Sequence, residues 1–343
     1  GERHPQAHDK GGFKAQDPDN LIPSATKDVL KKIGGKFMKM QLFDLMKISG
    51  PAKIAYPTTY LECYLSDYTY FPRYMDVVWN TKDNIERIKN VTTWILAGLH
   101  VGQWILQAYS PLNPILGETC QRECPNGTKY YAEQIMHHPP ISAAVMEGPE
   151  NKWKFEVIQE FKAGLSGHNS VKAHKQGGMV LTLSDGTQYI VEEGHLNVSG
   201  LIYGELVVTV WGKITITDVT HNIVSEVIFD PDNKDGLFKG MTSKLTFWKS
   251  KKTKRPSDHF DIIIYEGEKK EKNVMATGKG SYLEYVEFEG ERYWEMGEEG
   301  CQWIKPESNK LLESDSSKRP DLWYIKEKDY QNAQIAKESL ENK

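Results

Sequence analysis

Two adjacent histidines, His137 and His138, precede two prolines in the stretch EQIMHHPP, which covers residues 133–140. An imidazole can act as a general base, bind a metal ion or, when protonated, hold an anion. In a strand, neighbouring side chains point to opposite faces, so one metal ion could not easily bind both histidines. The sequence contains no HExxH motif, GxSxG elbow or phosphate-binding loop beside them. We therefore expect neither a catalytic residue nor a metal site here.

A second stretch of similar construction, PLNPILGE, covers residues 111–118. Its prolines stiffen the backbone around Asn113, and Gly117 permits a close approach to a ligand. The two prolines after the histidines likewise fix the backbone, so the imidazoles could face a phosphate at little entropic cost. The residues alone leave two interpretations open. Both stretches are structural turns, or both form the rim of a clamp for a lipid headgroup.

Alternating polar and apolar residues between about 115 and 300 predict the structure that positions these stretches. WKFEVIQEF and HFDIIIYEGE have the texture of strands, and Asp185-Gly186 predicts a hairpin. Because no spacer of helical length separates the strands, we expect an antiparallel sheet that curls into a barrel with room for a ligand. Helical periodicity predicts a helix at 83–99 and a second, mostly polar helix near the C-terminus.

Composition excludes several classes of function. The 343 residues carry a net charge of −4, so no general positive field favours nucleic acid as a partner. No run approaches the ~18–20 apolar residues that span a bilayer, so membrane contact would be peripheral. The four cysteines form no CxxC pair, which favours a reducing cytosol. Residues 1–20 are polar and predict a flexible N-terminal arm.

Two short basic segments are candidates for contact with a membrane. In the first, Val29, Leu30 and Ile33 share one helical face among lysines, which predicts either a helix packed on the core or a lid that touches the membrane. The second, KSKKTKRPSD, interrupts the strand pattern and predicts either a solvated loop or a contact with anionic lipid headgroups. Its candidate residues are Lys249, Lys251, Lys252, Lys254 and Arg255.

Together the two proline-rich stretches resemble the fingerprints of the oxysterol-binding protein-related family. EQIMHHPP is similar to EQxSHHPP, PLNPILGE matches the second fingerprint, and both occur in the family's order and at its spacing. The resemblance implies a mainly β, α+β fold: a large incomplete antiparallel β-barrel that encloses a lipid tunnel, with an N-terminal lid and flanking helices. Residues 21–343 then form one domain, with a lid segment at 21–48, the barrel at about 115–300 and a C-terminal segment with a helix at 301–343.

Members of this family carry a sterol or a phospholipid between membranes, and many exchange it for phosphatidylinositol 4-phosphate. The resemblance thus implies a lipid carrier that is not an enzyme, has no cofactor, and binds membranes containing anionic lipid or phosphoinositide. We expect a cytoplasmic monomer, peripheral to the endoplasmic reticulum and other organelle membranes. The headgroup residues implied are His137, His138, Asn113, Lys337 and Glu341. The other fingerprint residues are Leu112, Pro114, Gly117, Glu118, Glu133, Gln134, Pro139 and Pro140.

Two positions depart from the family pattern. Ser110 stands where the family commonly has a lysine that helps to bind phosphate, and Met136 replaces the serine before the histidines. Loss of one charge-assisted contact would weaken phosphoinositide binding by about 1.5–3 kcal/mol. A lipid-dependent regulator without bulk transfer is an alternative function, and a hydrolase is a third that lacks a nucleophile. The sequence does not choose between a sterol and phosphatidylserine as the cargo.

Overall fold

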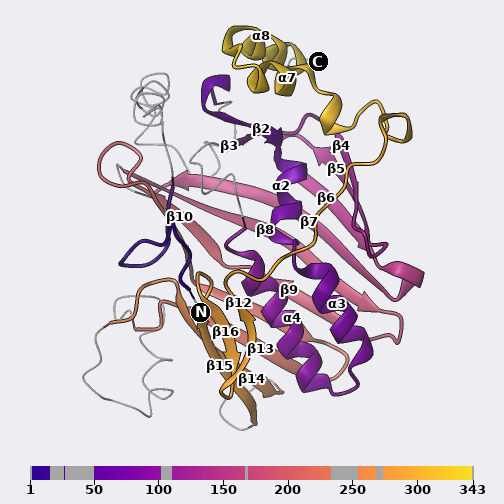
Figure 1. Cartoon of the computed structure of the whole chain (residues 1–343), viewed down its shortest axis with the longest axis vertical. Coiled ribbons are helices and arrows are strands. Elements are labelled where there is room, and N and C mark those ends of the chain that lie inside the picture. Colours follow the sequence, from indigo (N-terminus) through magenta and orange to yellow (C-terminus); the bar gives the residue numbers. More distant parts are fainter. Residues whose placement is uncertain are drawn as a thin grey trace.

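A large antiparallel sheet dominates the structure, a computed structural model (Figure 1). The residues described are 2–15, 27, 50–101, 110–166, 169–232, 254–267 and 273–341. Several residues singled out in the sequence lie outside them: Val29, Leu30, Ile33, Lys249, Lys251 and Lys252.

The sheet has 15 described strands, and most neighbours in space are neighbours in sequence. Its main path runs from β17 to β4, and the described residues show no pairing between these two edges. The expected incomplete antiparallel barrel is therefore confirmed. The strands are β1 (Phe13–Lys14), β4 (Thr119–Glu123), β5 (Lys129–Met136), β6 (Ile141–Glu147), β7 (Trp153–Leu165), β8 (Ser170–Leu183), β9 (Gln188–Glu192), β10 (His195–Ser199), β11 (Val207–Trp211), β12 (Lys213–Asp218), β13 (Ile223–Phe229), β14 (His259–Glu266), β15 (Val274–Ser281), β16 (Tyr285–Phe288) and β17 (Glu291–Glu295).

The sheet forks at β8. Residues 170–174 of this strand pair with β10, whereas residues 180–182 pair with β9. β9 continues the main path to β12, while β10 leads to β11 and β1. The hairpin predicted at Asp185-Gly186 is confirmed, because it joins β8 to β9 and Gly186 has a φ of 93°.

Helices α2 (Tyr60–Asp67), α3 (Phe71–Asn80) and α4 (Asn84–Gly98) cover part of the sheet (Figure 1). α4 confirms the helix predicted at 83–99. The Asp83 carboxylate caps it by accepting hydrogen bonds from the backbone N–H groups of Ile85 and Glu86. α4 packs against β12, β13, β16 and β17, and Trp94 packs edge to face on Phe71 and Phe155. An aromatic core thus joins the helices to the sheet.

A second, smaller core lies beside the C-terminal helices α7 (Pro320–Lys326) and α8 (Tyr330–Glu341), which lie together at one end of the molecule (Figure 1). α8 confirms the predicted C-terminal helix. Beside these helices, β2 (Ala55–Thr59) pairs in parallel with β3 (Ser110–Leu112). The core consists of Ala52, Leu112, Leu322, Ile325 and Ala333. Short 3-10 turns are η3 (Ala52–Ile54), η4 (Pro149–Asn151), η5 (Ser308–Lys310) and η6 (Ser316–Lys318).

The N-terminal segment differs from the flexible arm predicted for residues 1–20. Residues 2–15 are packed on the barrel, where β1 pairs with β11 and Phe13 is 2% exposed. Arg3 donates to the buried carboxylate of Asp258 at 2.7 Å. One apolar side chain and one buried ion pair therefore fix a segment whose average composition is polar.

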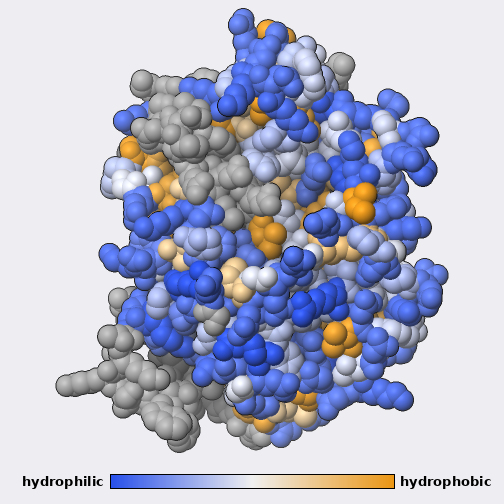
Figure 2. All heavy atoms as spheres, in the orientation of Figure 1, coloured by the Kyte–Doolittle hydropathy of each residue, from blue (hydrophilic) through white to orange (hydrophobic). Residues whose placement is uncertain are grey.

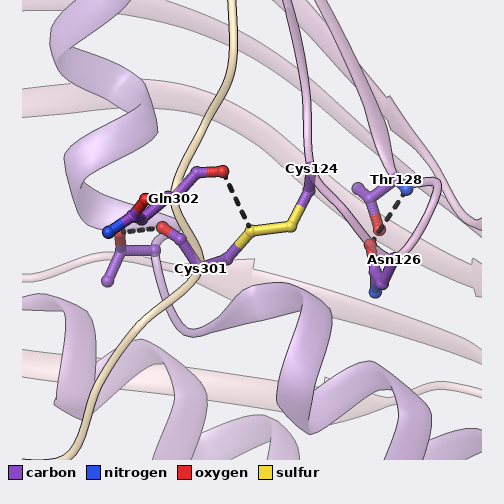
Figure 3. The surroundings of a disulfide bond; sticks show 6 residues. Cys124, Asn126, Thr128, Cys301 and Gln302 are labelled. Carbon is purple, nitrogen blue, oxygen red and sulfur yellow. Dashed lines mark hydrogen bonds between the residues drawn. A yellow bond between two sulfur atoms is a disulfide. The ribbon is translucent and has the colours of Figure 1, made fainter.

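Cys124 and Cys301 form a disulfide across 177 residues of sequence (Figure 3). Cys63 and Cys120 are free and buried. The spacing of the cysteines did not predict this pairing. The face seen in Figure 2 is largely hydrophilic, with small and separate hydrophobic patches. In the part of the chain that the structure describes, no helix is both long enough and apolar enough to cross a membrane.

Candidate functional site

The two proline-rich stretches lie side by side because they extend the β4–β5 ladder. The N–H of Gly117 donates to the carbonyl of Gln134, and the N–H of Gln134 donates to the carbonyl of Glu118, both at 2.9 Å. Residues 111–118 and 133–140, together called the rim loops from here on, therefore form one edge of the molecule. β4 and β5 are antiparallel neighbours with Thr119 opposite Glu133, so their register brings the two stretches together.

Four of the sixteen rim-loop residues, Leu112, Pro114, Glu118 and Gln134, are buried and hold the loops in place. Leu112 and Pro114 are buried, and Leu112 belongs to the smaller core. Gln134 is 1% exposed; its amide oxygen accepts from the Ser142 hydroxyl at 2.6 Å, and its amide nitrogen donates to the carbonyl of Met136. These contacts use both ends of the Gln134 side chain, so this residue shapes the loop and does not face a ligand.

Glu118 and Arg319 connect the rim loops to the C-terminal segment. Arg319 donates to the Glu118 carboxylate at 2.7 Å, to Asp321 at 2.6 Å and to the backbone carbonyl of Asn113 at 2.9 Å. Burial raises the pKa of Glu118, and the positive charge of Arg319 opposes this effect. Sequence reasoning missed Arg319, whose partner Glu118 lies 201 residues away. The only local signal was a charged residue between Lys318 and Pro320 at the start of a helix.

The histidines lie in the turn between β5 and β6, which corrects the assumption that they sit in a strand. Their ring centroids are 4.4 Å apart, so both imidazoles belong to one small surface. His137 is half-buried, whereas His138, Pro139 and Glu133 are exposed. The pKa of His137 is lowered by partial burial and by the neighbouring His138. The negative charge of Glu341 offsets part of this shift. In the described residues, no three His, Cys, Asp or Glu side chains gather in a way that could hold a metal ion.

Helix α8 brings Lys337 and Glu341 to the same region. Glu341 is near enough to His137 to influence its pKa, and it forms an ion pair with Lys337 at 3.3 Å. The Lys337 side chain is buried, and its ammonium group donates to the carbonyl of Gly50 at 2.9 Å. An anionic group bound here would therefore meet an ammonium that already interacts with a carboxylate and a backbone carbonyl.

Gly117 and Asn113 occupy particular positions in the rim loops. Gly117 has a φ of 76°, and a Cβ atom there would meet nothing within 4 Å. The left-handed backbone is sufficient reason for a glycine here, and the expected close approach of a ligand stays a prediction. Asn113 is half-buried, and its backbone carbonyl accepts a hydrogen bond from Arg319. Ser110 begins β3, directly before the first rim loop.

The two described members of the basic loop interact with carboxylates. Arg255 forms ion pairs with Asp232 at 3.0 Å and Asp261 at 2.8 Å, and Lys254 lies 3.6 Å from Asp230. Arg255 is thus paired with two carboxylates of the protein itself, which weakens its interpretation as a contact for anionic lipid, whereas Lys254 is 57% exposed and only loosely paired.

A cavity lies beneath the fork in the sheet. Its volume is about 60 Å³, well below the roughly 300–1,000 Å³ of pockets that hold a drug-sized ligand. Most of its wall is apolar and comes from α2, α4 and the strands around the fork. The lining residues are Asp67, Tyr68, Trp94, Ile95, Gly98, Leu99, Phe161, His174, Lys175, Met179, Glu193, Gly194, His195, Leu196, Val210 and Ile214.

One part of the cavity wall is charged. Lys175 forms ion pairs with Asp67 at 2.7 Å and Glu193 at 3.5 Å, and Gln159 also donates to Glu193. Burial by itself lowers the pKa of Lys175. The charges of Asp67 and Glu193 outweigh this effect, so the pKa of Lys175 is raised. The hydroxyl of Tyr68 is buried without a hydrogen-bond partner in the described structure. The cavity therefore offers a polar region to an otherwise apolar ligand.

An open antiparallel barrel with an apolar cavity and a polar rim defines a class of protein that binds apolar ligands. The family profile described as "Oxysterol-binding protein" matches residues 35–343. The chain therefore belongs to the oxysterol-binding protein family. The two proline-rich stretches had predicted this membership, and the prediction is confirmed.

Curated relatives agree with this assignment. "Oxysterol-binding protein 9" of Dictyostelium discoideum is 27% identical over 99% of this chain and 79% of its own length. Human "Oxysterol-binding protein-related protein 8" is 32% identical over 51% of this chain but only 20% of its own length. This chain thus corresponds to a small part of that human relative.

Solved structures share the fold. The yeast Osh3 ORD, solved in complex with PI(4)P, aligns with 97% of this chain and 85% of its own at a TM-score of 0.73 and 19% identity. The Osh1 ORD domain, solved in complex with ergosterol, aligns with 99% of this chain and 81% of its own at a TM-score of 0.70 and 18% identity. At this level of identity, the likeness supports the fold.

Proposed function

We propose that this protein carries a sterol or a phospholipid between membranes and exchanges it for phosphatidylinositol 4-phosphate. The observation that carries the proposal is the combination of an apolar cavity with a histidine-bearing rim in a chain of this family. Similar structures were solved with PI(4)P, ergosterol and cholesterol, which supports both kinds of ligand for this chain. The chain acts as a carrier and not as an enzyme.

The apolar part of the cargo enters at this cavity, whose walls must move apart to admit it because its volume is only about 60 Å³. Each CH₂ group that leaves water contributes about 0.8 kcal/mol, so a sterol or two acyl chains supply ample gross binding energy. The hydroxyl of Tyr68 is buried without a partner at the cavity wall, and a small polar group on that cargo would reach it once the wall moves. This arrangement suits an apolar lipid that carries a hydroxyl, which favours a sterol over a pair of plain acyl chains.

The rim binds the phosphorylated inositol headgroup. His137 and His138 present two imidazoles on one surface, and a phosphate beside them would favour their protonated forms. Lys337 and Glu341 lie on the adjoining face of α8, and Asn113 lies in the other rim loop. The acyl chains of the phosphoinositide would enter the cavity that the other cargo uses. Binding of the two lipids is then mutually exclusive, which is the requirement for exchange.

Transfer assays test this proposal directly. Liposomes containing a labelled sterol and phosphatidylinositol 4-phosphate are mixed with acceptor liposomes and a catalytic amount of protein. Many lipid molecules moved per protein molecule support a carrier, whereas about one per protein supports a lipid-dependent regulator. Mass spectrometry of the lipid that copurifies with the protein, before and after incubation with mixed liposomes, identifies the cargo.

The site of action is part of the same proposal. We infer a cytoplasmic protein that binds the surfaces of the endoplasmic reticulum and other organelles as a monomer. Fractionation of cells and size-exclusion chromatography with light scattering test these two points. Recovery in a single compartment with no membrane association would contradict the first of them.

A further inference from the structure

The disulfide between Cys124 and Cys301 lies at the start of the segment that leads to the headgroup residues of α8. Cys124 follows β4, and Cys301 follows β17 (Figure 3). At the same place, the N–H of Cys301 donates to the carbonyl of Thr69 at 2.6 Å. The disulfide thus ties the β4–β5 hairpin covalently to the chain that continues towards α7 and α8.

From Cys301 onwards, this segment follows β4 towards the rim loops. Glu123 and Ile304 exchange two backbone hydrogen bonds, at 2.9 and 2.7 Å. Further along, Thr119 forms a bridge with Asp315, whose carboxylate also accepts from the N–H of Gln121. The segment ends at Arg319, which holds the rim loops, and then enters α7 and α8. Its contacts therefore run from the disulfide to the candidate headgroup site.

We propose that Cys124 and Cys301 form a redox modification site that controls how firmly the C-terminal helices are held against the rim loops. In the oxidised form, the hairpin that carries His137 and the segment that leads to Lys337 are joined by a covalent bond. This bond preorganises the two halves of the site and strengthens binding of an anionic lipid headgroup. The last statement, on headgroup binding, rests on the proposed function.

The reaction is thiol–disulfide exchange with a low-molecular-weight disulfide. The thiolate of one cysteine attacks that disulfide, forms a mixed disulfide and releases one small thiolate. The second cysteine, as its thiolate, then attacks the protein sulfur of the mixed disulfide and releases the second small thiolate. Two protein thiols are thereby oxidised, one external disulfide is reduced to two thiols, and the two protons pass from the cysteines to the released thiolates.

Both redox states fit the surroundings of the pair. Cys124 is 7% exposed, whereas Cys301 is partly exposed, so an external thiol reaches the bond from the side of Cys301. The Cys301 sulfur lies 3.6 Å from the carbonyl of Gln302, where a thiol could donate a weak hydrogen bond (Figure 3). Reduction therefore leaves a polar thiol with an acceptor already in place.

The experiment compares the oxidised and reduced wild-type protein. After equilibration with oxidised glutathione, a non-reducing peptide map should contain a cross-linked peptide with Cys124 and Cys301. Hydrogen exchange should then be slower in residues 302–341 of the oxidised protein than in the reduced protein. The affinity for dioctanoyl phosphatidylinositol 4-phosphate should fall about fivefold on reduction, a typical size for coupling between sites.

Three variants serve as controls. Cys124→Ser and Cys301→Ser should each remove the response to oxidation, while Cys63→Ala, at a buried free cysteine, should retain it. Absence of the cross-link, or equal hydrogen exchange in both states, would overturn the proposal. Equal affinity in both states would overturn its headgroup part. If the oxidised protein binds no probe, the proposed function and the headgroup part both fail, but the exchange data still decide whether the bond holds the helices.

Discussion

Replacement of Arg319 by methionine tests how the rim loops are held. Its guanidinium contacts the carboxylates of Glu118 and Asp321, and the three side chains are 4%, 1% and 0% exposed. Methionine keeps much of the apolar stem but leaves two buried carboxylates without their cation. Removal of one partner from a buried ion pair typically destabilises a protein by about 3–5 kcal/mol.

We therefore expect Arg319→Met to lower the free energy of unfolding by about 3–5 kcal/mol at pH 7. A typical domain is stable by about 5–15 kcal/mol, so the loss is a large share of the total. Urea unfolding followed by tryptophan fluorescence measures it as a lower midpoint with an unchanged slope. Arg292→Met is the matched control, because Arg292 and its partners Glu287 and Glu295 are partly exposed. We expect that variant to lose less than about 1 kcal/mol.

The pH dependence provides a second test of the same reasoning. Burial already raises the pKa of Glu118, so the folded state binds a proton at this carboxyl more readily than the unfolded state. Its contribution to stability is therefore greatest below the unfolded pKa and is lost as the pH rises. Without Arg319 this effect grows, so the deficit of Arg319→Met should shrink as the pH falls, and adding Glu118→Gln should restore part of the stability. Equal losses in Arg319→Met and Arg292→Met would refute the argument.

Four further predictions concern the site and the core. The double variant His137→Ala and His138→Ala should lose phosphoinositide extraction from liposomes but retain the apolar cargo, and equal loss of both in a folded protein would contradict separate roles. Because burial and His138 lower the pKa of His137, headgroup binding measured by calorimetry should strengthen as the pH falls below neutrality, and a flat profile would argue against a role for its charge. Burial lowers the pKa of His100 from 6.5 to about 4, so stability is present above about 6.5 and is lost as the pH falls towards 4. At about 1.36 kcal/mol per pKa unit this loss amounts to about 3 kcal/mol, and thermal unfolding of His100→Phe should show no such loss. Leu196→Trp should fill part of the cavity and reduce sterol binding in a fluorescence assay while headgroup binding persists; unchanged sterol binding would place the cargo elsewhere.

Local patterns in the sequence predicted much of the fold. WKFEVIQEF alternates because β7 buries every second side chain, from Trp153 through Phe155 to Val157. Likewise, Asp83 at the start of α4 and Asp185-Gly186 between β8 and β9 act through contacts within a few residues. These features depend on short-range geometry, which is visible in a single sequence.

The features that the sequence did not predict depend on partners that are far away along the chain. Phe13 pairs with Val208, Arg3 binds Asp258, and Cys124 bonds to Cys301. Only the folded barrel makes these residues neighbours, so neither composition nor spacing could identify the pairs. The rim loops were predicted as a site from their prolines and histidines, but which of their residues are buried depends on Ser142 and Arg319 in other elements.

The fork at β8 has a mechanical consequence for the cavity. Between residues 174 and 180 the strand passes from one neighbour to the other, so its ladder to β10 and its ladder to β9 are separate. Side chains bridge this gap: Lys175 and Gln159 both bind Glu193. Side-chain contacts are broken more easily than a continuous backbone ladder. We therefore expect the two branches of the sheet to separate more easily here than along their ladders. At this point the wall of the cavity is therefore held by side chains and not by backbone pairing.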